Sequence, residues 1–204
     1  MQPDSASTAA GSLAPLADIN ELALELMARR AAGEPAGLPA ILRDSATLWR
    51  TLTVPQRHRL AGCPFLLVDI GLGGLQSQPR NSLEGVRERG ADRQWFEGES
   101  LPRLAYLTLT YAWHLARTRR LVARVVLGIA DDCADWLAAL SLRQLGECLE
   151  CSPRHLRPRW AGNPEVWHHL LESVASPDPA AFELARMRGV QLLAAPYWPV
   201  ARNP

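Results

Sequence analysis

Apolar residues recur at helical spacing along most of the chain, and this pattern predicts a mostly helical protein. The N-terminal part predicts helices over residues 17–32 and 39–52, followed by a third helix that begins after Thr53. Asp18 is the expected cap of the first helix. Thr53 is the expected cap of the third, because Pro55 follows in the first turn, where no backbone donor is needed.

The apolar segment Cys63–Ile70 is too short for its periodicity to separate a buried strand from a buried helix. We favour a helix, because no partner strand is visible in the sequence. The GLGG motif at residues 71–74 then begins a long polar connection that reaches about residue 100. Loops of this length are usually functional or mobile, and this one is the best candidate boundary between an N-terminal and a C-terminal half of the chain.

The strongest helical pattern covers residues 101–126, with Ser100 as the expected cap and Gly128 at the break that follows. Further helices are predicted over residues 131–140, 142–151, 164–173 and 179–194, with Ser141 as the cap of the second of these. The predicted fold class is therefore all-α, a helical bundle that forms a single domain or two small helical halves joined by a long polar loop.

This pattern divides the chain into five expected parts. They are a disordered tail (1–15), an N-terminal helical part (16–75), a loop (76–100), a second helical part (101–195) and a C-terminal tail (196–204).

Composition places the chain among ordinary globular proteins, because 48% of its 204 residues are hydrophobic and 21% are charged. No apolar run approaches the roughly 20 residues that a membrane span needs. The N-terminus has neither a basic flank nor an apolar signal core. We therefore expect a cytoplasmic protein without a membrane partner, whose four cysteines are reduced.

All 22 positive charges are arginines, yet the formal net charge is only +1, so any nucleic-acid contact must depend on local clusters. Two such clusters exist, one near the end of the predicted 101–126 helix and one before Trp160. They are candidates for contact with a phosphate backbone or with a protein partner, and solvated helix ends are the alternative. The candidate contact residues are Arg117, Arg119, Arg120, Arg124, Arg143, Arg154, Arg157, Arg159 and Trp160.

Residues 127–160 carry Leu-Gly-Ile followed by an acidic pair, two short amphipathic helices in tandem and a basic segment. The matching positions are Leu127, Gly128, Ile129, Asp131, Asp132, Ala134, Leu137, Ala139, Leu140, Ser141, Leu142, Gln144, Leu145, Glu150 and Arg159, with Leu109, Ala112, Leu115 and Ala123 in the helix before them. This stretch resembles FlhD, the D subunit of the bacterial flagellar master transcription regulator, over roughly residues 102–175.

The resemblance implies a helical protein that dimerises and acts with a partner subunit at promoter DNA. Leu156 stands where that family has a cysteine, so the family's disulfide is not expected. The two tandem helices, residues 130–140 and 142–151, have the arrangement of a helix-turn-helix, but plain packing is the more common use of such a pair. The second of them carries Glu147 and Glu150, which would repel phosphates.

No pattern for catalysis, a metal or a cofactor stands out. Cys148 and Cys151 form one CxxC pair, whereas a structural zinc site usually needs two, and small buried apolar groups are the simpler interpretation. The aspartates at 131, 132 and 135 fit the start of a helix better than a carboxylate cluster. The GLGG motif lacks the lysine of a phosphate-binding loop. We therefore expect a protein that is not an enzyme and uses no cofactor.

Three classes of function stay open. The first is a transcription regulator that binds a partner subunit and also contacts DNA, with a homodimer formed through residues 101–126. The second is an anti-activator that covers a transcription factor, such as a quorum-sensing or secretion regulator, without touching DNA. The third is a secretion chaperone or adaptor. The first two share the expectation that the chain controls gene expression through contacts with another macromolecule.

Overall fold

The computed structural model describes residues 5–33, 38–72 and 95–194, with side chains placed from residue 14 onward except at position 151. Ten α-helices and one two-stranded antiparallel sheet occur in this part of the chain. The elements are α1 (Ser5–Ala31), α2 (Ala40–Arg43), α3 (Ala46–Thr51), α4 (Val54–Ala61), β1 (Val68–Asp69), α6 (Leu101–Thr118), α7 (Arg120–Leu127), α8 (Asp131–Ala139), α9 (Leu142–Cys151), the 3₁₀ turn η1 (Ser152–Arg154), β2 (Arg157–Pro158), α10 (Pro164–Ala175) and α11 (Pro179–Ala194).

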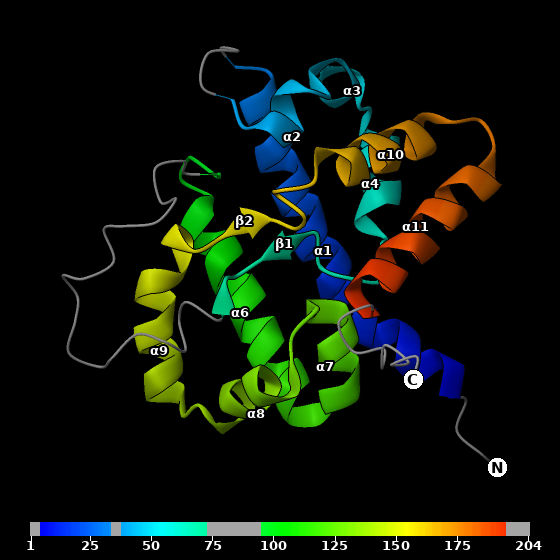
Figure 1. Cartoon of the computed structure of the whole chain (residues 1–204). Helices are drawn as coiled ribbons and strands as arrows, with labels where there is room; N and C mark the ends of the chain where they lie inside the picture. The colour runs from blue at the N-terminus through cyan, green and yellow to red at the C-terminus, as the bar shows by residue number, and fades with distance from the viewer. Residues whose placement is uncertain (1–4, 34–37, 73–94, 195–204) are drawn as a thin grey trace, which may run out of the picture.

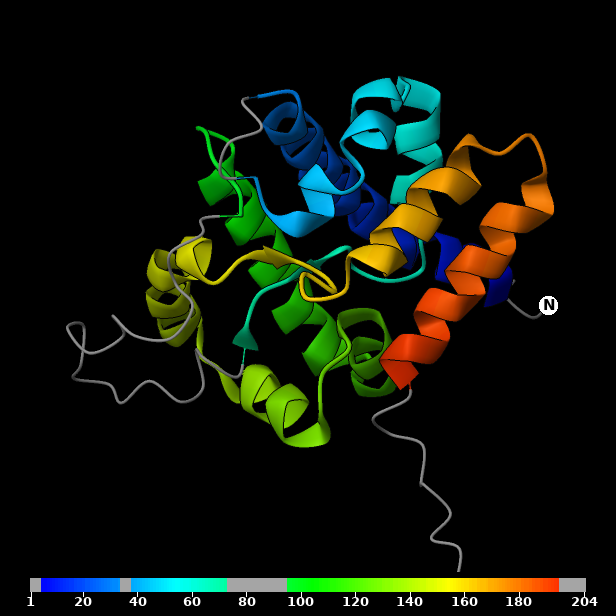
Figure 2. The ribbon, with the colours of Figure 1, turned by 45° about the horizontal axis from the view of Figure 1, so that its top comes forward.

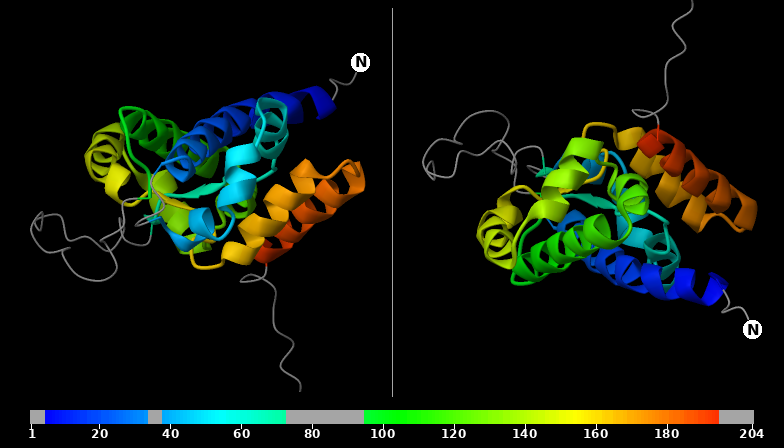
Figure 3. Two further views of the ribbon diagram at one scale, coloured as in Figure 1. Left: turned by 90° about the horizontal axis from the view of Figure 1, so that it is seen from above. Right: turned by 90° about the horizontal axis from the view of Figure 1, so that it is seen from below.

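The two short strands lie at the centre of the molecule, and helices surround them (Figure 1). Val68 pairs with Pro158 and Asp69 with Arg157. The α10–α11 hairpin forms one side of the molecule (Figure 2), and α1 lies on the opposite side of the strands (Figure 3). The all-α prediction is confirmed, since the sheet contains only two residues per strand.

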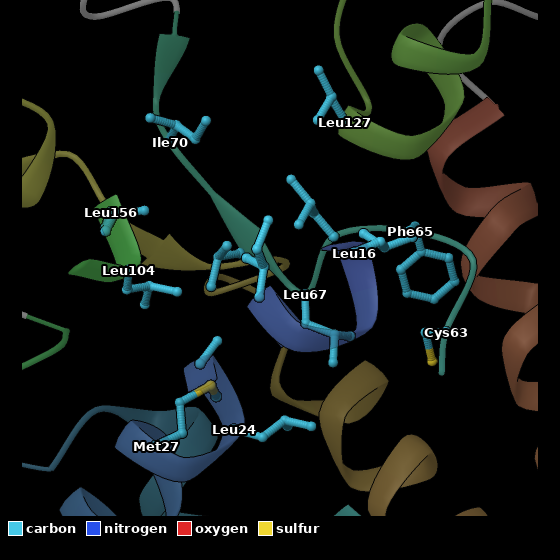
Figure 4. Close-up of a cluster of buried hydrophobic side chains, with 14 of the residues drawn as sticks. Leu16, Leu24, Met27, Cys63, Phe65, Leu67, Ile70, Leu104, Leu127 and Leu156 are labelled. Carbon is cyan, nitrogen blue, oxygen red and sulfur yellow. The ribbon is translucent and has the colours of Figure 1, made fainter. Parts of the chain in front are cut away.

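A single hydrophobic core joins the parts of the chain that precede and follow the long connection. Figure 4 shows side chains of α1 (Leu24 and Met27), of the central segment (Phe65 and Leu67) and of α6 (Leu104) in one buried region. These side chains belong to one continuous buried cluster that also includes residues of α10 and α11. Of the two arrangements left open by the sequence, the structure therefore has the single domain, because one buried cluster contains residues from both halves.

Several predicted boundaries are wrong in the N-terminal part. Helix α1 begins at Ser5, so residues 5–15 are helical and not a tail, and Asp18 lies inside the helix and does not cap it. Leu16 and Ile19 are buried, so the apolar face of α1 extends toward the N-terminal end of the helix. The predicted 39–52 helix is divided into α2 and α3. The described residues do not include 73–94, which make up most of the predicted 76–100 loop. They also do not include the predicted 196–204 tail.

The segment Cys63–Ile70 is not helical as we favoured, because it bends and then forms the strand β1 (Val68–Asp69), and its hydrogen bonds explain why. Asn20 of α1 donates from Nδ2 to the carbonyl oxygens of Ala61 and Phe65 at 3.1 and 3.0 Å, and its Oδ1 accepts from the Leu67 amide at 2.8 Å. On the other side, Arg159 donates to the carbonyls of Leu66 and Val68 at 2.6 and 3.0 Å. Two buried polar side chains therefore satisfy the groups that a helix would have satisfied internally.

Other predicted boundaries are confirmed by their local chemistry. Thr53 and Ser141 each form a capping box with the glutamine three residues later, which satisfies backbone donors at the starts of α4 and α9. Gly128 ends α7 with φ +62°, in the left-handed region where a helix-ending glycine is favoured. Ser100 precedes α6 as predicted but makes no capping bond with its side chain.

Candidate protein-binding surface

The basic cluster near residue 120 lies where one predicted helix is in fact two. Arg119 has φ −145° and ψ 63°, which ends α6 and starts α7 in a new direction. Its amide donates to the Leu115 carbonyl at 2.8 Å, and its carbonyl accepts from the Ala123 amide at 2.9 Å. We call the exposed side of this junction the α6–α7 corner, and define it by Arg117, Arg119, Leu121, Val122 and Val125.

Helix α7 is apolar on both faces. Ala123, Val126 and Leu127 are buried against the rest of the molecule. Leu121, Val122 and Val125 point outward, and Leu121 is 72% exposed. Positions i, i+1 and i+4 share one side of a helix. Three exposed aliphatic side chains therefore form a patch on a helix of eight residues, and apolar surface of this kind is typical of interaction sites.

Two of the predicted contact residues are held by helix α8. Arg120 forms ion pairs with Asp131 at 3.2 Å and with Asp135 at 2.7 Å, and Arg124 reaches Asp131 at 3.1 Å. The aspartates at the start of α8 thus neutralise the arginines of α7, in addition to their favourable position at a helix N-terminus. Arg120 and Arg124 are consequently poor candidates for phosphate contact.

The remaining two arginines of this cluster border the apolar patch. Arg117 lies over the ring of Trp113 at 4.8 Å, and the Trp113 indole is itself fixed by a 2.9 Å bond from its Nε1 to the Leu140 carbonyl. Arg119 is exposed and forms no ion pair with a described residue. The corner therefore combines an exposed aliphatic patch, which is typical of interaction sites, with two arginines, a residue type enriched at protein interfaces.

The candidate contact residues of the second basic segment, the one before Trp160, are not all available at the surface. Arg159 is 7% exposed and bonds the central segment, so its prediction as a contact residue is corrected to an internal role. Arg157 pairs with Asp69, with its Nη2 at 2.7 Å from Oδ2. Trp160 is half-buried against Phe65, with ring centroids 5.4 Å apart. Arg154 is exposed.

The tandem helices α8 and α9 both pack against α6. The outward face of α9 exposes Leu142, Arg143, Glu147 and Glu150, and Arg143 pairs with Glu147 at 3.2 Å. A recognition helix of this composition would present two carboxylates to the phosphates, which is unfavourable. This geometry favours plain packing over insertion of α9 into DNA.

One arrangement escaped the sequence analysis, a line of serine, histidine and glutamate. Ser45 Oγ lies 3.1 Å from His168 Nδ1, and His168 Nε2 lies 3.1 Å from Glu172 Oε1. The residue types are those of a hydrolase triad, but the two ring nitrogens are exchanged, since a triad serine bonds Nε2 and the carboxylate bonds Nδ1. Ser45 is also only 3% exposed, so its hydroxyl does not reach a substrate from solvent. The bond joins α3 to α10. His168 and Glu172 stand four residues apart on one helix, whereas only the fold brings Ser45 to them.

The cysteines and acidic residues give no metal site within the described residues, where no group of three potential ligands comes together. Cys63 and Cys133 are buried free thiols, and Cys148 is half-buried. Burial raises the pKa of Cys63 to about 12 and that of Cys133 to about 11. These two thiols therefore stay protonated at neutral pH, and neither is a reactive nucleophile.

Asp69 is the carboxylate that pairs with the candidate contact residue Arg157. Burial alone would raise its pKa, but Arg159, Arg157 and the Gly71 amide together hold the pKa of Asp69 below its usual value. The Gly71 amide donates to Oδ1 at 2.8 Å, and Arg157 donates to Oδ2 from Nε and Nη2 at 2.9 and 2.7 Å. The charged form is thus favoured in the folded state.

This carboxylate predicts a loss of stability in acid. A group whose pKa is lower in the folded state stabilises the protein above its unfolded pKa, about 3.9 for aspartate, and that stability is lost as the pH falls through the folded pKa. Urea unfolding at pH 7 and pH 3 should give a smaller acid-induced loss for Asp69→Asn than for the wild type. Equal losses in the two proteins would contradict this role of Asp69.

No helix in the described part of the chain is both long enough and apolar enough to cross a membrane. Comparison with protein-family models finds no match to this chain, and comparisons with curated proteins and with solved structures find no significant match either.

Proposed function

We propose that this protein is a non-enzymatic binding protein that holds another protein at the α6–α7 corner. The observation that supports this proposal is the outward apolar face of α7 beside Arg117 and Arg119. Leu121 and its neighbours are exposed although the protein has a well-filled core elsewhere. Covering this face would remove apolar surface from water and provide carboxylates or carbonyls for the two arginines.

The partner class that we favour is a transcription factor or a regulator subunit, because residues 127–160 resemble the flagellar regulator subunit. An anti-activator role fits better than direct DNA contact, since Arg120, Arg124 and Arg157 are paired with aspartates and Arg159 is buried. A secretion chaperone or adaptor would use the same surface, and the identity of the bound protein separates these classes.

Two leucines of nearly equal exposure provide a matched test. Leu121 of the corner is 72% exposed, and Leu142 at the start of α9 is 73% exposed. A photo-crosslinking amino acid placed at position 121 in the producing cell should capture one specific protein, and the same group at position 142 should not. Leu121→Asp should weaken binding of the purified captured protein at least tenfold, whereas Leu142→Asp should leave it unchanged.

Both aspartate variants should keep the unfolding transition of the wild type, because neither side chain is part of the core. Equal crosslinking at the two positions would contradict the assignment of the corner. Salt-sensitive DNA binding that disappears in Arg117→Ala and Arg119→Ala would instead favour a DNA-contacting regulator. The captured protein, a transcription factor or a secretion component, decides between the remaining classes.

A further inference from the structure

A second surface lies between α1 and α6, which run alongside each other in Figure 3, and its residue His114 is one helical turn from Arg117 of the corner. The two helices form a groove of about 630 Å³. On α1 it extends from Pro15 to Glu25, and on α6 from Arg103 to His114. Each helix contributes side chains at spacings of three and four residues, so each wall is one continuous helix face. Ten residues of helix measure about 15 Å, which corresponds to about three turns.

The floor of the groove is apolar. Ile19 is buried, Leu22 and Leu107 are partly buried, and all three line the groove. Tyr106 stands on the rim and is 55% exposed. An apolar floor between two helix faces, with a large aromatic side chain at the edge, is the shape that receives a third helix.

The α1 wall is acidic. Asp18, Glu21 and Glu25 all line the groove, and their spacing of three and four residues places them along one edge of α1. Asp18 is exposed and forms no ion pair with a described residue, Glu21 contacts His58 at 3.3 Å, and Glu25 pairs with Arg29 at 2.5 Å. The α6 wall offers Arg103 as its one permanent cation among the groove residues. Among the groove residues themselves, three carboxylates therefore stand against one arginine, and Asp18 is the carboxylate that has no ion pair with a described residue; the nearby cations are Arg29, which pairs with Glu25, and Arg119, whose charge acts on Tyr111.

Two hydroxyl groups of the groove residues have no partner. Thr110 Oγ1 and Tyr111 Oη are buried and form no hydrogen bond with any described residue, and both residues line the groove. Tyr111 is only 9% exposed. A buried hydroxyl without a partner destabilises the free protein, and a polar group of a molecule bound in the groove would supply the missing hydrogen bond.

We propose that the α1–α6 groove binds an amphipathic helix of a partner protein whose apolar face is bordered by arginine or lysine side chains. The apolar face would cover Ile19, Leu22 and Leu107. The cationic side chains would meet the acidic edge of α1. The groove and the α6–α7 corner are defined by different residues, so each surface can be tested with its own variants. The groove does not depend on the function proposed for the corner.

The probe for this proposal is a fluorescein-labelled 18-residue designed peptide with leucines on one helical face and arginines on both flanks. A matched peptide replaces every arginine with glutamate. Fluorescence anisotropy with the full chain should give at least tenfold tighter binding of the arginine peptide, and added salt should weaken it. Equal binding of both peptides, or binding of neither, would overturn the proposal.

Charge reversal in the groove distinguishes binding at this site from a general electrostatic attraction between the peptide and the protein surface. The double variant Asp18→Arg and Glu25→Arg should lose the preference for the arginine peptide, whereas Glu147→Arg on α9 should retain it. Leu121→Asp should also retain the preference, so an error in the proposal for the corner can be distinguished from an error in the proposal for the groove. Binding that is unchanged in the double variant would overturn the proposal.

Tyr111→Phe provides a readout that a purely structural role would not give. Removal of an unpartnered buried hydroxyl should leave the thermal unfolding temperature unchanged or raise it. The same change should weaken binding of the arginine peptide several-fold, because the Tyr111 hydroxyl gains a hydrogen-bond partner in the complex. A lower unfolding temperature together with unchanged peptide binding would overturn the role assigned to this hydroxyl.

Discussion

Replacement of Asn20 by leucine is expected to lower the free energy of unfolding by about 4 kcal/mol, because three buried backbone groups would lose their partner. Asn20 is fully buried in α1 and bonds the carbonyls of Ala61 and Phe65 and the amide of Leu67. Leucine has a similar volume and a better helix propensity, so neither a cavity nor the helix itself would explain the loss. Urea unfolding followed by tryptophan fluorescence measures it.

A second substitution at the same position tests the cause. Asn20→Asp keeps an acceptor for the Leu67 amide but directs negative charge at two carbonyl oxygens. The buried carboxyl should therefore have a raised pKa in the folded protein, and the variant should approach wild-type stability as the pH falls from 7 to 5, where the carboxyl binds a proton. A pH-independent difference from the wild type, or a loss below about 1 kcal/mol in Asn20→Leu, would contradict the role of these bonds.

Replacement of Arg159 by methionine is expected to cost about 3 kcal/mol of folding free energy, since two buried carbonyls would be left without donors. Arg159 donates from Nε to Leu66 and from Nη2 to Val68. Methionine preserves most of the aliphatic stem, so the change removes mainly the guanidinium group. The same unfolding measurement applies, at neutral pH.

Arg157→Met is the matched control, because Arg157 lies two residues away and contacts the same Asp69. Its side chain is 55% exposed, and exposed ion pairs contribute about 1 kcal/mol or less. Equal losses for the two variants would show that Arg159 has no special internal role. The result also affects any test of nucleic-acid binding, since loss of binding in a variant without Arg159 would report unfolding and not a missing contact.

Local sequence signals predicted the helix ends well where a capping side chain or a glycine marks the end. Thr53 and Ser141 form the expected capping boxes, and Gly128 takes the left-handed conformation at the end of α7. The long 101–126 helix was wrong at one point, because nothing in the local pattern indicates the break at Arg119. The pairing of Arg120 and Arg124 with Asp131 stabilises the turned α7 instead, and that contact joins two different helices.

The arginine clusters were visible in the sequence, but their uses were not. Arg117 and Arg119 remain at the surface, as a contact role requires. Arg159 belongs to the interior, and Arg157 is engaged by a carboxylate 88 positions away in the chain. Composition gives the number of charges and their spacing, whereas the distance to an opposite charge depends on the tertiary arrangement. The exposed face of α7 was missed for the same reason, since its apolar residues resembled core positions.

The helical class, the ends of most helices and the two arginine clusters could all be predicted from the sequence, because caps, glycines and periodicity act between residues close in the chain. The non-helical path of Cys63–Ile70 and the single core that joins both parts of the chain depend on contacts between distant residues. The physical reason is that a buried backbone must find partners, and Asn20 and Arg159 supply them from far along the chain. The same long-range packing placed the α1–α6 groove and exposed the α6–α7 corner.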